Sequence, residues 1–283
     1  MKKATPFVLI ADDFGITEGV SEAIVELLNA KKISGASAIC TLPNWSQLAF
    51  DLAKFREERD IGLHLNLTLG RPISSMPCLA PTKKFPPLPV LIRKVLTGRI
   101  CTQEICKEIL YQITAYANAI GELPTFIDGH QHVHALPIIR NALFDSMKKI
   151  SPNWHPWLRN PNEPLTAIIS RGEEVRKSLF ISTLSCGFKP LADAHGYPTN
   201  DSFAGVSGFD PNRNLNDTFS RYLKRPSRRH LVMCHPGFSD NQLRVIDPVV
   251  EMRDIEFKFL NGPEFSLILE RMNMRVAQFS ECN

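Results

Sequence analysis

Short apolar runs alternate with helix-like segments along most of the chain. Residues 7–11, 36–41 and 61–67 have the pattern of buried strands, and residues 17–32 and 45–56 have the apolar spacing of helices. Such alternation predicts a mostly parallel sheet covered by helices. We therefore expect an α/β fold, a single (β/α) barrel with seven or eight strands that is irregular if the number is seven. An open doubly wound sheet is the alternative.

The rest of the chain continues this pattern less evenly. A long helix is expected over residues 102–120 and a late strand over 230–235, whereas residues 185–215 are rich in Gly, Asn and Asp and hard to assign. No linker or internal repeat interrupts the 283 residues, so we expect one domain over residues 1–283. No glycine-rich phosphate loop follows the first strand, which argues against a nucleotide-binding sheet.

Composition and charge exclude several classes of protein. The net charge is only +4, and the basic clusters at 224–225 and 228–229 are too short to predict a nucleic-acid surface. No apolar run approaches the roughly 18 residues of a membrane span, and the run at 6–11 is too short for a signal peptide. The seven cysteines are scattered without a CxxC pair. We expect reduced thiols and a cytoplasmic protein.

Residues 70–89 break the alternation. Six prolines in this stretch fix backbone angles and remove hydrogen-bond donors, so it predicts a long loop. Loops of this length inside a domain usually serve function. We expect the segment to border a substrate pocket, with a simple surface excursion as the alternative.

Polar side chains gather where the predicted strands end. They include five of the eight histidines, so a chance cluster is a poor explanation. The carboxyl ends of parallel strands meet at one mouth of a barrel, where catalytic residues lie. The set comprises Asp12, Asp13, His64, Asp128, His130, His132, His134 and His235.

Imidazole and carboxylate groups together suit a divalent metal ion such as Mg²⁺ or Zn²⁺. A site with three protein ligands leaves an open position for water and substrate. Within the pair Asp12–Asp13, a turn at the strand end can present both carboxylates to one cavity, where one binds metal and the other handles protons. In isolation, a loop or a helix N-cap is the alternative interpretation of such a pair.

Four motifs in this order resemble those of the YdjC-like carbohydrate deacetylases. They are ADDFG at 11–15, GLHLNL at 62–67, DGHQHVH at 128–134 and MCHPG at 233–237. The resemblance extends from residue 6 to about residue 240. It implies a (β/α) barrel whose activity is the metal-dependent removal of N-acetyl groups from amino sugars, chitooligosaccharides among them.

The resemblance also implies roles for single residues. Asp13, His64 and His130 would hold one divalent metal ion, Asp12 would be the base, and His235 would be the general acid or its partner. Residues 151–225 match the family less clearly and are expected to shape the sugar pocket.

The roles of several further polar residues stay open between alternatives. Asp128 either orients a ligand histidine or ends a strand as a turn residue. His132 is a candidate substrate contact or supporting group, and His134 stays undecided. Arg159 follows a short predicted strand and either binds the substrate or forms a surface salt bridge.

Two rival functions remain open at this point. A phosphoesterase would need cationic clamps or a second carboxylate cluster, neither of which is clear in the sequence. A non-catalytic sugar-binding relative would need neither a base nor an acid. The expected partner is a small N-acetylated sugar or a glycolipid head group, and no nucleic acid. The sequence does not decide between a monomer and a homodimer.

Overall fold

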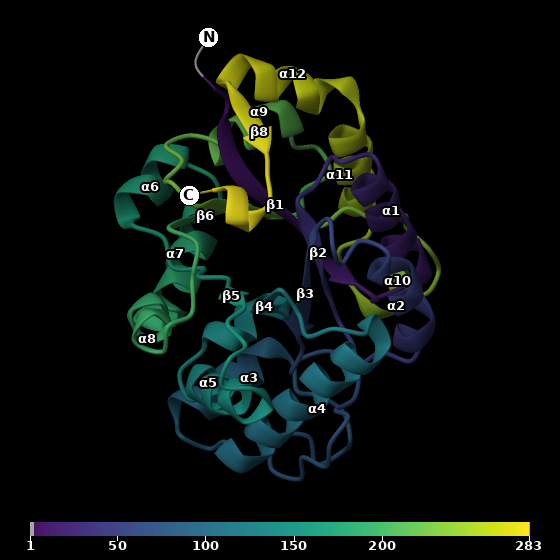
Figure 1. Cartoon of the computed structure of the whole chain (residues 1–283), viewed down its shortest axis with the longest axis vertical. Helices are drawn as coiled ribbons and strands as arrows, with labels where there is room; N and C mark the ends of the chain where they lie inside the picture. Colours follow the sequence, from purple (N-terminus) through teal and green to yellow (C-terminus); the bar gives the residue numbers. More distant parts are fainter. Residues whose placement is uncertain (1–2, 283) are drawn as a thin grey trace.

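Seven parallel strands form the centre of the computed structural model, which describes residues 3–282 (Figure 1). Their order across the sheet is β5-β4-β3-β2-β1-β7-β6, and β8 (Met274–Val276) pairs with the start of β1. The sheet curls into a half-barrel, so the predicted α/β, barrel-like fold is confirmed. The strands are β1 (Thr5–Phe14), β2 (Gly35–Ala38), β3 (Asp60–Leu65), β4 (Phe126–Gly129), β5 (Trp157–Leu158), β6 (Ser202–Ala204) and β7 (His230–Cys234).

One bridge links the two edges of the curled sheet. Leu158 in β5 pairs in parallel with Thr199, just before β6, and its N–H donates to Pro198 O at 2.8 Å. The Asn200 side chain continues the link by bonding the backbone N–H and C=O of Asn160. The chain between these two edges leaves the sheet and forms three helices.

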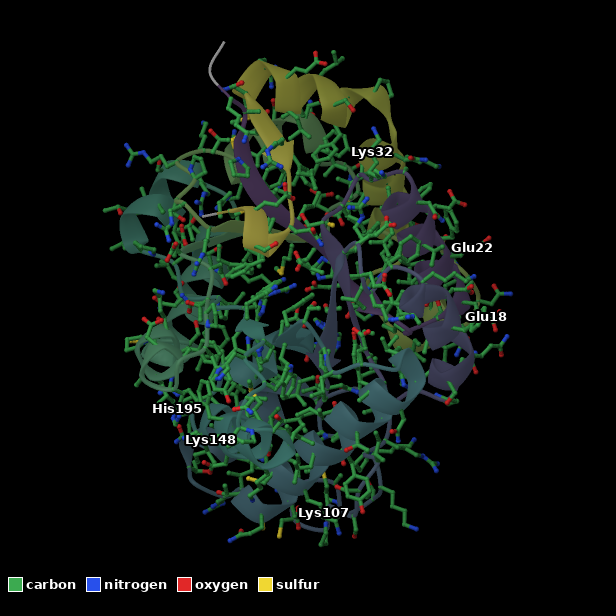
Figure 2. The ribbon with its side chains drawn as sticks, in the orientation of Figure 1. Glu18, Glu22, Lys32, Lys107, Lys148 and His195 are labelled. Carbon is green, nitrogen blue, oxygen red and sulfur yellow. The ribbon has the colours of Figure 1, made fainter. Side chains whose placement is uncertain are left out.

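Helices surround the sheet (Figure 1). In α1, Thr17 caps the first turn by accepting the N–H of Val20 at 3.3 Å, while Glu18 and Glu22 point outward (Figure 2). The helices are α1 (Glu18–Asn29), α2 (Trp45–Ala53), α3 (Leu88–Leu96), α4 (Thr102–Ile120), α5 (Ile139–Ile150), α6 (Leu165–Arg171), α7 (Val175–Leu184), α8 (Phe188–Ala194), α9 (Leu215–Tyr222), α10 (Leu243–Ile246), α11 (Glu251–Asn261) and α12 (Pro263–Met272), with 3₁₀ turns η1 (His130–Ala135) and η2 (Phe279–Glu281).

The proline-rich segment is tied down rather than loose. The carboxylate of Glu108 on α4 accepts the N–H groups of Ile73 and Ser74 at 3.0 and 2.7 Å, which fixes the segment across that helix. The loop prediction is wrong for the last two residues of the segment, Leu88 and Pro89, because α3 starts at Leu88. Pro87 and Pro89 suit a helix start, where the missing N–H costs nothing. Among the residues described, no helix has the length and apolar character needed to cross a membrane.

Candidate active site

Asp12 and Asp13 lie near the end of β1, where its register with β2 is irregular. Successive strand residues normally point to opposite faces. Asp13 instead has φ 70°, a left-handed conformation that aspartate tolerates better than most residues. Both side chains therefore line one cavity, and each residue is only 2% exposed. The expected presentation of both carboxylates to one cavity is confirmed.

Arg159 grips the Asp12 carboxylate with both guanidinium nitrogens. Nη1 lies 2.6 Å from Oδ2 and Nη2 lies 2.5 Å from Oδ1, and Nη2 also lies 2.5 Å from Asp128 Oδ2. Although burial opposes ionisation of Asp12, the Arg159 charge lowers the pKa of this carboxyl to about 2. Arg159 is fully buried, so the alternative of a surface salt bridge was wrong.

Asp13 connects three other site residues. Its Oδ1 lies 2.9 Å from His130 Nδ1 and 3.3 Å from His64 Nε2, while Oδ2 accepts a 2.6 Å bond from Arg253 Nη2. Burial raises the Asp13 pKa, but Arg253 and His130 outweigh it and hold that pKa well below its usual range. The carboxylate therefore stays ionised, as a metal ligand requires.

A carboxylate orients His64 from behind. The Nδ1 of His64 lies 2.7 Å from Asp128 Oδ1, and Ser37 Oγ lies 2.9 Å from the same nitrogen. Burial disfavours the imidazolium, but Asp128 overcomes this and raises the His64 pKa to about 10. At this pKa both ring nitrogens carry a proton, and a metal ion would bind Nε2 in place of the proton that faces Asp13. The Nδ1–H bond to Asp128 is the usual second contact of a metal-binding histidine.

The donor atoms of Asp13, His64 and His130 fit a divalent ion. All three lie within 4.8 Å of one another. Metal–ligand bonds of about 2.1 Å place neighbouring donors roughly 3 to 3.5 Å apart, which matches the 2.9 and 3.3 Å separations from Asp13 Oδ1. A second group, Asp12 with His64 and Asp128, fits less well because Arg159 already occupies both carboxylates.

The charge around this cluster also favours a cation. Four carboxyl groups share two guanidinium groups, an excess of negative charge that a divalent ion offsets. The carboxyl groups are Asp12 and Asp128 on Arg159, and Asp13 and Asp247 on Arg253.

His235 lies on the other side of Asp12. Its Nε2 is 3.9 Å from Asp12 Oδ2, and the ring packs edge-on against Phe209. Burial lowers the His235 pKa to about 4, despite the pull of Asp12, so the ring is neutral at neutral pH. Its backbone N–H donates to Glu256 Oε2 at 2.5 Å.

The remaining histidines of the predicted cluster, His132 and His134, lie in the turn η1 and face different surroundings. Gln131 and His132 both have left-handed backbone angles, with φ 54° and 60°, and both line the cavity. His134 is fully buried and its Nε2 lies 2.7 Å from the Arg159 carbonyl, so it supports the arginine and does not reach the cavity lining.

A cavity of about 630 Å³ opens over these groups. Its lining includes the polar residues Asp12, Asp13, His64, His130, Gln131, His132, His235 and Arg253. Much of the remaining wall is apolar: Leu69, Pro87, Leu88, Pro89 and Ile92 near the proline-rich segment, Phe180, Ile181 and Leu184 on α7, and Ile246, Pro248 and Val249 before α11. Only the C-terminal end of the proline-rich segment, residues 87–89, thus lines the cavity, and the expectation is wrong for residues 70–86.

Two charged residues on α11, Arg253 and Glu256, were absent from the site predicted from the sequence. Both are buried, at 1% and 3% exposure. In the sequence they belong to an ordinary charged helical stretch, Arg-Asp-Ile-Glu, which is typical of a solvated face. Only the packing of α11 against the loop after β7 distinguishes them.

Known proteins match this chain over nearly its whole length. A family model described as YdjC-like protein matches residues 6–271. A chitooligosaccharide deacetylase of Yersinia enterocolitica is 24% identical over 280 residues, which cover 96% of this chain and 97% of that protein. A carbohydrate deacetylase of Clostridium beijerinckii is 23% identical over 97% of this chain and 98% of its own length.

One solved structure shares the fold over its full length. It is that of an Enterococcus faecalis protein described as a candidate for cellobiose-phosphate cleavage, with a TM-score of 0.71, 20% identity and 99% of both chains covered. Because the family model spans almost the whole chain and includes all four motifs, the protein belongs to the YdjC-like family.

Proposed function

We propose that this protein is a metal-dependent carbohydrate deacetylase that hydrolyses the acetamide of an N-acetylated amino sugar. The cluster of Asp13, His64 and His130, with Asp12 and His235 beside it in one cavity, is the observation that carries the proposal. The deacetylases named above, which match almost end to end, support it.

Asp13, His64 and His130 would hold the ion. When bound there, a divalent ion polarises the acetamide carbonyl and lowers the pKa of a water molecule. Asp12 would accept the proton of that water. Its low pKa makes it a weak base, but the same Arg159 bonds that lower the pKa also fix the carboxylate in place. Positioned proton transfer of this kind contributes roughly 10²–10⁴ in rate.

His235 would protonate the departing amine, since an amide nitrogen leaves poorly as an anion. Because the low pKa keeps this imidazole neutral, it must first receive a proton. Asp12 Oδ2, 3.9 Å from Nε2, is the nearby source. This separation exceeds a direct hydrogen bond, so the proton taken from water would pass from Asp12 to His235 through one bridging water molecule and then to the amine.

The cavity wall favours a substrate with an apolar part. Aliphatic walls stabilise apolar groups by about 25 cal/mol per Å², whereas sugar hydroxyls lose water there without finding partners. No tryptophan or tyrosine is among the described residues that line the cavity. We infer that a glycolipid-type amino sugar fits this chain better than a long chitooligosaccharide.

Acetate release tests both levels of the proposal. The substrates are alkyl glycosides of N-acetylglucosamine with lengthening chains, compared with diacetylchitobiose, each with a panel of divalent metals. We expect metal-dependent acetate release, with kcat/KM rising up to about fourfold per added methylene at about 0.8 kcal/mol each. The variant Ile92→Ser should flatten this series, while exposed Leu267→Ser, on α12, should not.

Two outcomes would contradict the proposal. Phosphate release from sugar phosphates, without acetate release, would favour a phosphoesterase. Saturable sugar binding without any turnover would favour a binding protein. A flat response to chain length, with acetate still released, would remove only the apolar preference.

A further inference from the structure

The extended segment that follows β7 runs along α11. Alternate backbone N–H groups of this segment donate to acceptors on that helix. The donors are His235, Gly237 and Ser239, and their acceptors are, in the same order, Glu256 Oε2 at 2.5 Å, Arg253 O at 3.1 Å and Asp254 Oδ1 at 3.2 Å.

The other side of the segment is fixed as well. Phe238 donates its N–H to Gly19 O on α1 at 3.1 Å, and Pro236 has no N–H to place. Every backbone donor from His235 to Ser239 is therefore satisfied, which a buried backbone requires. The segment is clamped between two helices, and Glu256 accepts the backbone N–H of His235 itself.

Glu256 is an unusual choice for this task. It is only 3% exposed, and burial raises the pKa of its carboxyl to about 7. Burying an ionisable group is costly unless it is well bonded. The bond to the His235 N–H offsets part of that cost, and it fixes the backbone of His235, the proposed acid.

The same helix holds the metal-binding side of the site. Arg253, one turn before Glu256, donates to Asp13 Oδ2 at 2.6 Å and to Asp247 Oδ2 at 2.7 Å. Residues three apart on a helix share a face. One rigid element thus contacts both the proposed acid and a proposed metal ligand.

We propose that Glu256 is a positioning residue for His235, and that α11 fixes the acid relative to the Asp13 side of the site. The proposal rests on the proposed deacetylase function for its kinetic test. The placement of His235, however, can be measured without turnover.

Three substitutions of Glu256 test the idea. Glu256→Ala removes the acceptor, and we expect kcat to fall about 10- to 100-fold, the effect of a misplacement of about 1 Å. KM and metal content should stay within about twofold, because neither depends on the His235 backbone. Glu256→Gln keeps an acceptor and should retain most of kcat. Glu251→Ala, an exposed carboxylate on the same helix, is the matched control.

Unchanged kcat in Glu256→Ala would overturn the proposal, as would a Gln variant as slow as the Ala variant. If Glu256→Ala does not fold, Glu256→Asp carries the test, because it withdraws the carboxylate by one methylene. Its kcat should fall, and an unchanged kcat would overturn the idea.

If the wild type releases no acetate, the deacetylase proposal fails separately. The His235 ring resonances in NMR spectra then decide. They should shift in Glu256→Ala and stay near wild type in Glu256→Gln, and the absence of a shift in Glu256→Ala would overturn the positioning role.

Discussion

Asp12 and Asp13 are neighbours in the chain, yet each is held by a different buried arginine. Arg159 grips Asp12 and Arg253 grips Asp13, each with a bond of 2.6 Å. Each carboxylate thus pairs with its own guanidinium group, although both line one cavity. Their proposed roles can be separated by mutation.

Asp12→Asn keeps the size of the side chain but cannot accept a proton. We expect normal metal content and a rate lower by about 10²–10⁴. Asp13→Asn removes the anionic metal ligand, so metal content should fall and excess metal should partly restore activity. Elemental analysis with acetate-release kinetics checks both. The reverse pattern would exchange the two roles, and two active, metal-loaded variants would refute the mechanism.

His64→Ala and His130→Ala should each lose bound metal, because each removes one of three donors. Elemental analysis after dialysis measures the loss. His155→Ala, an exposed histidine outside the cluster, is the control and should keep its metal. Full occupancy in both site variants would place the metal elsewhere.

Arg159→Met should destabilise the fold by about 3–5 kcal/mol at neutral pH, since it leaves buried carboxylates unpaired. The lowered Asp12 pKa stabilises the wild type above about pH 4, and this contribution disappears as the pH falls toward 2. The difference between wild type and variant should therefore shrink in acid. Urea unfolding at pH 7 and at about pH 2.5 measures it, with Arg213→Met, a part-exposed ion pair, as control. An equal difference at both pH values would contradict this.

Asp60 provides a test of opposite sign. It accepts the N–H of Phe279 at 2.8 Å, and burial raises its pKa from 3.8 to about 6. The folded protein holds this proton more tightly than the unfolded chain, so stability falls as the pH rises from about 4 to 6, by at most about 3 kcal/mol. Asp60→Asn keeps an acceptor and should be more stable than wild type at pH 7.

Thermal melting from pH 4 to 8 measures this difference, which should vanish near pH 4. Asp51→Asn, at an exposed ion pair, should show no such trend. A variant less stable than wild type at pH 7 would mean that the ionised carboxylate is needed for the C-terminal turn.

Sequence reasoning located several strands to within about three residues because local apolar patterns determine them. The helix expected over residues 102–120 is α4 (Thr102–Ile120), and the cluster of Asp13, His64 and His130 lies together as the barrel topology predicts. The supporting groups were harder to predict. Arg159 and Arg253 are ordinary cations in the sequence, and only long-range packing brings each onto an aspartate more than 140 residues away.

The bridge between Leu158 and Thr199, which links the two edges of the sheet, has a consequence for how related sequences can vary. The chain between these two residues forms α6, α7 and α8 and returns to the same place in the sheet. Its α7 contributes Phe180, Ile181 and Leu184 to the cavity wall, whereas the proposed metal ligands all come from elsewhere. Apart from Arg159, which holds Asp12, this excursion can vary by insertion, deletion or exchange and so change the cavity wall without touching the proposed metal ligands.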